Sequence, residues 1–216
     1  QLRLCIQAYL ACTTFVDAQV GRVLDALDRS PHADNTIIIL FSDHGYHLGE
    51  KERVSKQGLW EESTKVPFIV ATPNGRGSEK RHQPVGLIDI YPTLVDMCGL
   101  PKRPQNAGHS LVPLIENSGV TWRHSIITTY AMNNHALRSD RFRYIRYEDG
   151  SEELYDHFRD SNEWTNLANN SEYARELDAF RQGLPKDNAP YHPIVGSRPI
   201  NPWFAEHYER LRVDNR

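Results

Sequence analysis

The sequence predicts an α/β fold: a mixed sheet flanked by helices, followed by a small antiparallel sheet with one helix. Residues 36–41 form an unbroken apolar, β-branched run, which is typical of a parallel strand covered on both faces. Residues 2–27 place apolar side chains mostly three or four positions apart, which predicts an amphipathic helix packed on a sheet. From residue 125 onward, short β-like runs replace this pattern and predict the antiparallel sheet.

The remaining elements follow in chain order. A polar loop after the first strand leads to a second buried strand over residues 66–70. Asp89 is expected to cap a helix that runs to about residue 98, where Gly99 ends it. These elements form the expected first unit, residues 1–122, and residues 123–216 form the second.

The second unit is predicted to contain a hairpin and a covering helix. Residues 148–150 have the composition of a hairpin turn, and a helix is expected over about 172–181. Over residues 141–147, arginines alternate with aromatic or apolar residues, which predicts a half-buried strand with a solvated arginine face; a groove for a polyanion is the alternative. The proline-rich residues 185–216 are expected to be an extended tail, with a short helix near 204–211.

Composition limits the possible functions. The chain has 216 residues, of which 39% are hydrophobic and 25% charged, which suits one medium domain or one with a small appendage. Its net charge of −3 argues against nucleic acid or an anionic membrane as a partner. Cys5, Cys12 and Cys98 lack metal or redox spacing, and the first two are expected to be small buried residues. Because Gln1 is not an initiator methionine, the sequence is expected to begin within a longer protein or after processing.

Candidate chemistry lies where the strand over residues 36–41 ends, at Ser42-Asp43-His44-Gly45. The carboxyl ends of strands in an open α/β sheet face the ligand crevice, so Asp43 and His44 are placed to meet a metal or an anion. An isolated Asp-His-Gly is usually a turn or a cap, and an isolated lysine such as Lys56 is usually a solvated charge. The combination of these residues, with the pattern that follows them, favours a functional site.

The pattern resembles the metal-site region of the sulfatases. The resemblance rests on residues 42–45, on Lys56 thirteen positions after Asp43, and on Leu59-Trp60-Glu61-Glu62-Ser63-Thr64-Lys65-Val66-Pro67. It is closest to the iduronate-2-sulfatase and choline-sulfatase branch of the alkaline-phosphatase-like superfamily, and it implies the C-terminal part of that fold. It also implies that Asp43 and His44 bind one divalent cation, usually Ca²⁺ with Mg²⁺ possible, and that Lys56 contacts the sulfate and its leaving oxygen.

Elementary chemistry supports these roles. Negative charge grows on sulfate and on the leaving oxygen during S–O cleavage, and a dication and a lysine ammonium stabilise such charge. Calcium prefers oxygen ligands, so His44 is expected to hydrogen-bond sulfate as much as it binds metal. His47 is either a substrate-pocket contact or an exposed loop histidine. His135 is a second substrate-pocket candidate, with a structural histidine as the alternative.

The expected nucleophile is missing. Sulfatases convert a Cys or Ser in a Cys/Ser-x-Pro/Ala-x-Arg motif to formylglycine, and none of the three cysteines here fits that motif. The resemblance therefore implies that the N-terminal part of the same protein supplies formylglycine and that this chain is inactive by itself. It implies a sulfated small molecule or glycan as substrate, and a periplasmic, secreted or lysosomal location. The alternatives are a phosphonate or phosphodiester hydrolase of the same superfamily and a non-catalytic anion-binding module.

Overall fold

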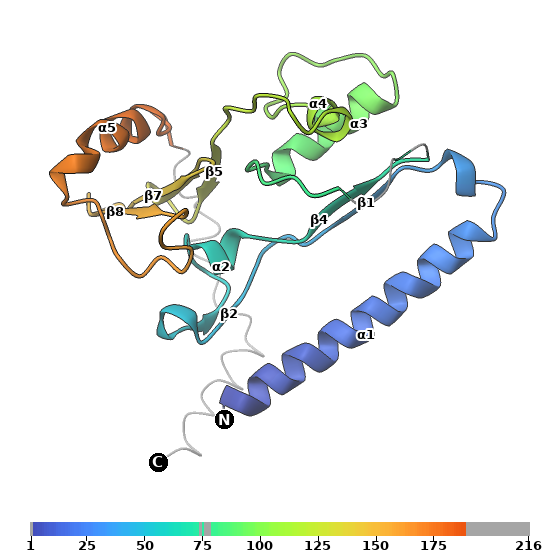
Figure 1. The fold of residues 1–216 in the computed structure, drawn as a ribbon, viewed down its shortest axis with the longest axis horizontal. Coiled ribbons are helices and arrows are strands. Elements are labelled where there is room, and N and C mark those ends of the chain that lie inside the picture. Colours follow the sequence, from blue (N-terminus) through green and yellow to red (C-terminus); the bar gives the residue numbers. More distant parts are fainter. Residues whose placement is uncertain (1, 74, 76–78, 189–216) are drawn as a thin grey trace, which may run out of the picture.

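The computed structural model describes residues 2–73, 75 and 79–188. Its first part is a pair of strands with helices on two sides: α1 lies on one side of the pair, and α3 and α4 lie on the other (Figure 1). The described residues thus have the expected mixed α/β character. The bounds of these elements are Leu2–Asp28 for α1, Ile38–Phe41 for β1, Phe68–Ala71 for β4, Ile90–Met97 for α3 and Val112–Glu116 for α4.

Strands β1 and β4 run antiparallel, with Ile38 opposite Ala71 and Phe41 opposite Phe68. The prediction of a parallel strand covered on both faces is therefore wrong for the described residues. Phe41 and Ile69 keep 49% and 57% of their surface exposed. An unbroken apolar run predicts burial but carries no information about strand direction, and here the segment between the strands returns the chain in the opposite direction.

Helix α1 contains no buried residue. Leu4, Phe15 and Val23 are 65–69% exposed, so the expected packing of this helix on a sheet is wrong for the described residues. Cys5 and Cys12 are exposed with the rest of the helix, which also corrects the expectation that they are buried. The described helices include none with the length and apolarity needed to cross a membrane.

The segment between β1 and β4 contains the short elements that carry the candidate site. It forms a two-stranded antiparallel ribbon and then the one-turn helix α2, which leads into β4. The elements are β2 (His47–Leu48), η2 (Glu50–Glu52), β3 (Val54–Ser55) and α2 (Glu61–Thr64).

The C-terminal part is a four-stranded antiparallel sheet in the order β5-β6-β7-β8, followed by α5 (Figure 1). This confirms the predicted small sheet and its helix. Gly150 turns the chain between β7 and β8 with φ of +84°, in the left-handed region that favours glycine. The bounds are Ile126–Thr129 for β5, His135–Arg138 for β6, Phe142–Arg146 for β7, Glu152–Asp156 for β8, Ser171–Tyr173 for η4 and Ala174–Gln182 for α5.

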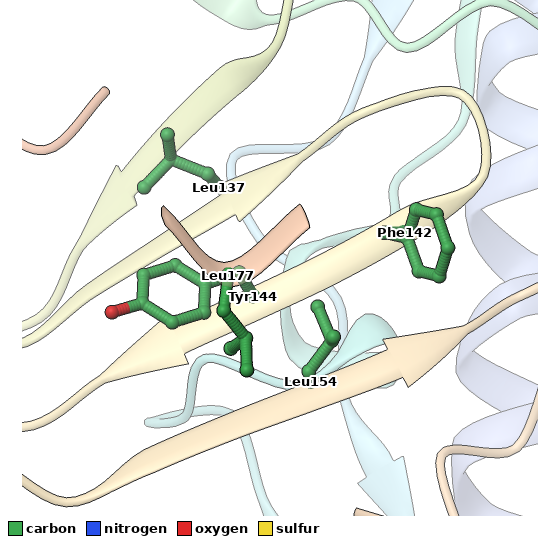
Figure 2. Close-up of a cluster of buried hydrophobic side chains, with 5 residues drawn as sticks. All are labelled: Leu137, Phe142, Tyr144, Leu154 and Leu177. Carbon is green, nitrogen blue, oxygen red and sulfur yellow. The ribbon is translucent and has the colours of Figure 1, made fainter. Parts of the chain in front are cut away.

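Strands β6, β7 and β8 of this sheet carry buried side chains on both faces. On one face Leu177 of α5 packs on side chains from β6, β7 and β8, among them Tyr144 and Leu154, which are fully buried (Figure 2). On the other face Leu59, just before α2, packs on Ile145 and on residues of the neighbouring strands. The sheet is therefore held between its own helix and the segment that carries the candidate site.

Burial of the second face corrects the expectation of a solvated arginine face. Arg143 is only 2% exposed. Side chains alternate along a strand, so Arg143 shares its face with Ile145, and the predicted all-arginine face is interrupted there. The apolar Ile145 draws the covering segment onto this face, and Arg143 is buried with it.

Asp89 directly precedes α3 as predicted, but its side chain makes no cap bond to that helix and instead caps the turn before it. Its fully buried carboxylate accepts hydrogen bonds from the backbone N–H groups of Gly86 and His109, each at 2.8 Å. The bond from Gly86 caps the 3-10 turn Leu87–Asp89 that leads into α3, and the bond from His109 fixes a distant segment to this turn. Gly99 has a φ of +62° just beyond the helix. Most of the predicted tail, including the helix expected near 204–211, lies outside the described residues.

Candidate functional site

Three of the residues predicted from the sequence come together just beyond β1. The Nε2 atom of His44 lies 3.6 Å from Oδ1 of Asp43 and 2.8 Å from Nζ of Lys56. Lys56 is twelve positions from His44 in the chain, and the ribbon of β2 and β3 returns it to this point. A carboxylate, an imidazole and an ammonium group therefore converge at one place.

The hydrogen bonds of His44 define how its ring can act. Its Nδ1 atom lies 2.9 Å from the carbonyl oxygen of Gly45, which can only accept a hydrogen bond, so Nδ1 carries the ring proton. The Nε2 atom then presents its lone pair to the ammonium group of Lys56. One of the three protons of Lys56 is used in this bond, and two remain to donate to an anion.

The loop is fixed against helix α2 at Gly45. Its N–H donates to the carbonyl oxygen of Ser63 at 2.9 Å. A Cβ atom at Gly45 would lie 2.1 Å from the carbonyl oxygen of Glu62 and 2.8 Å from that of Lys65. Glycine is required here because the backbone of α2 approaches so closely, whereas the sequence had indicated only a sharp turn.

Asp43 and His44 fit the geometry of two neighbouring ligands of one cation. Ligands at right angles around calcium, each about 2.3–2.6 Å from the ion, lie about 3.3–3.7 Å apart. The observed separation of 3.6 Å falls in this range. The Asp43 carboxylate is 82% exposed and free to turn toward an ion, while the lone pair of His44 is already engaged by Lys56. Asp43 is thus the better ligand of the two.

The other two predicted site residues are buried and have separate partners. His47 is 1% exposed, with Nδ1 3.2 Å from the carbonyl oxygen of Glu50 and its ring edge-on to Trp60, so it is not an exposed loop histidine. His135 is 4% exposed, and its Nδ1 atom lies 2.9 Å from Oγ1 of Thr129. Within the described ranges, neither ring hydrogen-bonds to the Asp43, His44 and Lys56 group.

A buried ionic cluster that the sequence did not predict lies beside α2. The Glu163 carboxylate contacts Arg143 Nε at 2.6 Å, His157 Nε2 at 2.9 Å and the backbone N–H of Glu61 at 2.9 Å. Arg143 also donates to the Glu61 carboxylate and, at 3.0 Å, to the carbonyl oxygen of Leu59. The cluster ties the start of α2 to strand β7 and to the loop after β8.

Glu61, His157 and Glu163 have the residue types of a metal site, but their charges are already balanced. Their potential ligand atoms all lie within 4.8 Å of one another. Burial acts to raise the pKa of Glu61, but Arg143 and Arg138 outweigh it and hold this pKa below its ordinary value of 4.5. Two guanidinium groups thus neutralise two carboxylates, and a cation would have to displace Arg143. The cluster is therefore an ion-pair network that joins two parts of the fold.

Two further features accompany the network. Glu163 has φ of +60°, a conformation that costs a non-glycine residue roughly 1–2 kcal/mol, and Lys51 donates to its carbonyl oxygen. An open pocket of about 500 Å³ lies along α2 and gives solvent access to Glu61 and His157. It is lined by both acidic and basic side chains, including Lys65 and Arg138.

Sequence reasoning missed this network because its members are far apart in the chain. Glu61 and Glu163 are 102 positions apart, and Arg143 looked like one of several surface arginines. Ile145, on the same strand face as Arg143, was the one available sign that this face is covered. The glutamates of the Trp60-Glu61-Glu62-Ser63 segment were noted only as part of a family pattern.

The sequence is similar to known proteins over most of its length. Residues 5–100 match the family model described as Sulfatase. A sulfatase of Formosa agariphila is 47% identical over 210 residues, which is 97% of this chain and 41% of that protein. A choline-sulfatase of Rhizobium meliloti is 34% identical over 172 residues, covering 76% of this chain and 33% of that protein. The chain belongs to the sulfatase family.

Solved structures share the fold. A structure in complex with its substrate D-glucosamine-2-N,6-O-disulfate has a TM-score of 0.69 and 30% identity, over 82% of this chain and 38% of that one. A phosphonate monoester hydrolase of Agrobacterium radiobacter has a TM-score of 0.64 and 28% identity, over 78% of this chain and 38% of that one. The mixed α/β structure is that of the alkaline-phosphatase-like fold. The chain spans about two-fifths of the length of curated relatives that it matches.

Proposed function

We propose that this chain is part of a sulfuric ester hydrolase and supplies one side of its active site. The observation that supports this most directly is the convergence of Asp43, His44 and Lys56 at the end of β1, in a chain of the sulfatase family. The net reaction breaks the S–O bond of a sulfate ester with water, giving an alcohol and sulfate. Charge develops on sulfate and on the leaving oxygen, and a preorganised ammonium group stabilises it there.

Each residue has a defined task in this proposal. Asp43 offers carboxylate oxygen to a divalent cation, calcium in preference to magnesium, and His44 completes or orients that contact. When bound, the cation would supply positive charge that stabilises the negative charge of the sulfate. Lys56 is held by His44 Nε2 and donates hydrogen bonds from its two remaining N–H groups to the sulfate and the leaving oxygen. The proton that the leaving oxygen gains comes, in the net reaction, from the water that is consumed. His47 and His135 are assigned to the substrate pocket, where their buried rings would support its wall.

The nucleophile lies in another part of the same protein in this proposal. Formylglycine and the remaining metal ligands come from an N-terminal part that packs with this chain, and the chain alone is inactive. The exposed apolar side chains of α1 and of β1 and β4 give that part a surface to cover. The proposed substrate is the sulfate ester of a small molecule or a glycan, in line with the disulfated glucosamine bound by a structural neighbour and with the similarity to choline-sulfatase. An iduronate-2-sulfatase-like specificity is the finer form of the proposal.

A phosphonate monoester hydrolase is the second candidate, because a structural neighbour has that activity. Rates of the full-length protein on matched aryl sulfate and aryl phosphonate monoesters decide between the two. A clear preference for the sulfate supports the proposal, and a preference for the phosphonate overturns it. If the protein hydrolyses neither ester, the remaining alternative, a non-catalytic anion-binding module, is favoured.

A further inference from the structure

The loop after β8 holds the first residue of helix α2 through the carboxylate of Glu163. This side chain is 2% exposed, and its Oε2 atom accepts the backbone N–H of Glu61 at 2.9 Å. Its Oε1 atom contacts Arg143 at 2.6 Å and His157 at 2.9 Å. Arg143 reaches the same segment by donating to the carbonyl oxygen of Leu59 at 3.0 Å. The start of α2 therefore cannot shift without breaking buried ionic contacts.

The other end of α2 holds the candidate active-site loop. The carbonyl oxygen of Ser63 accepts the N–H of Gly45 at 2.9 Å, and the carbonyl oxygen of Glu62 lies so close that Gly45 has no room for a side chain. Gly45 directly follows Asp43 and His44 in the chain. A displacement of α2 would thus be transmitted to Asp43 and His44, the second of which contacts Lys56.

We propose that Glu163 and Arg143 are positioning residues for the active site. They hold α2 in place, and α2 in turn fixes the loop that carries Asp43 and His44. This inference rests on the proposed function for its catalytic consequence, but not for the mechanical coupling between Glu163 and Gly45. It also assigns a task to the C-terminal part of the chain, where Arg143 of β7 and Glu163 of the following loop contribute to the geometry of a site formed by distant residues.

The test compares two matched substitutions in the full-length protein. Glu163→Gln keeps an oxygen that can accept the Glu61 N–H but removes the charge that pairs with Arg143. Glu152→Gln removes an equivalent charge from strand β8, where Glu152 pairs with Arg181 of α5 at 2.6 Å. The structure gives only the first of these residues a contact with α2 among those it describes.

Two readouts are measured at a temperature where both variants are folded. Hydrogen–deuterium exchange of a peptide covering residues 42–46 reports how firmly the Gly45 N–H is held. Calcium affinity and kcat on an aryl sulfate report the consequence for the site. Glu163→Gln is expected to speed exchange in this peptide and to lower kcat or calcium affinity by about tenfold, the low end of what loss of a supporting contact causes. Glu152→Gln is expected to match the unaltered protein in the exchange of this peptide and in kcat and calcium affinity.

The outcomes separate this inference from the proposed function. Faster exchange at residues 42–46 in Glu163→Gln alone supports the coupling, even if the unaltered protein hydrolyses no sulfate ester. Equal exchange and equal kinetics in the two variants overturn it. If Glu163→Gln does not yield folded protein, Arg143→Lys replaces it, because lysine keeps the charge but cannot reproduce the guanidinium contacts to Leu59, Glu61 and Glu163 together. Unchanged exchange in Arg143→Lys then overturns the inference.

Discussion

Replacing Lys56 by alanine in the full-length protein isolates the electrostatic part of the proposed mechanism. The Nζ atom is held 2.8 Å from His44 Nε2, so it is a preorganised donor rather than a freely moving surface charge. Loss of one such donor to developing charge typically lowers the rate by a factor of about 10²–10³, or about 2.7–4 kcal/mol of transition-state stabilisation. We expect this loss in kcat on an aryl sulfate.

The assay is steady-state kinetics together with calcium titration. Lys56 supplies no atom to the cation, so calcium affinity should not fall when it is replaced. Lys56→Arg should not restore the rate, because a broad planar guanidinium cannot reproduce the compact ammonium between His44 and the sulfate. Lys102→Ala is the matched control: Lys102 is 78% exposed and paired with Asp96 at 3.6 Å, away from the site.

A Lys56→Ala rate within about threefold of the unaltered protein would refute the assignment, because that is far less than the loss expected for such a donor. Equal losses in Lys56→Ala and Lys102→Ala would point to a general charge effect instead. Either result would mean that Lys56 is a solvated loop lysine without a role in the reaction.

Three further predictions concern the metal, the core and the pH dependence of stability. Asp43→Ala should abolish calcium binding and turnover while leaving the circular dichroism spectrum unchanged, because the carboxylate is exposed; calorimetric calcium affinity equal to that of the unaltered protein would contradict it. Leu154→Ala should lower the free energy of unfolding by about 2–5 kcal/mol in urea titration, because Leu154 is fully buried. The bond from Arg181 holds the pKa of Glu152 at about 2, below its ordinary 4.5, so this carboxylate contributes stability above pH 4.5 that is lost as pH falls toward 2. The thermal unfolding temperature should therefore fall between pH 4.5 and pH 2 in the unaltered protein, and it should fall less in Glu152→Gln.

The sequence by itself was informative where the signal is local. A hairpin at Gly150 follows from the turn residues and the alternating strands on either side of it, and the role of Asp89 follows from capping chemistry. Asp43, His44 and Lys56 are grouped in the sequence by the resemblance of residues 42–45, Lys56 and residues 59–67 to the sulfatase pattern. The family followed from the same residues.

Only the tertiary structure decided features that depend on what covers a residue. The direction of β4 against β1 could not be read from an apolar run, since such a run reports burial and not orientation. Arg143 is buried because Leu59 packs on Ile145 of the same face, a contact across more than eighty positions of chain. Gly45 is needed because the carbonyl oxygens of α2 approach it, which depends on how the loop docks and not on its own conformation. Local propensities act over a few residues, whereas burial and ion pairing depend on which distant segments meet.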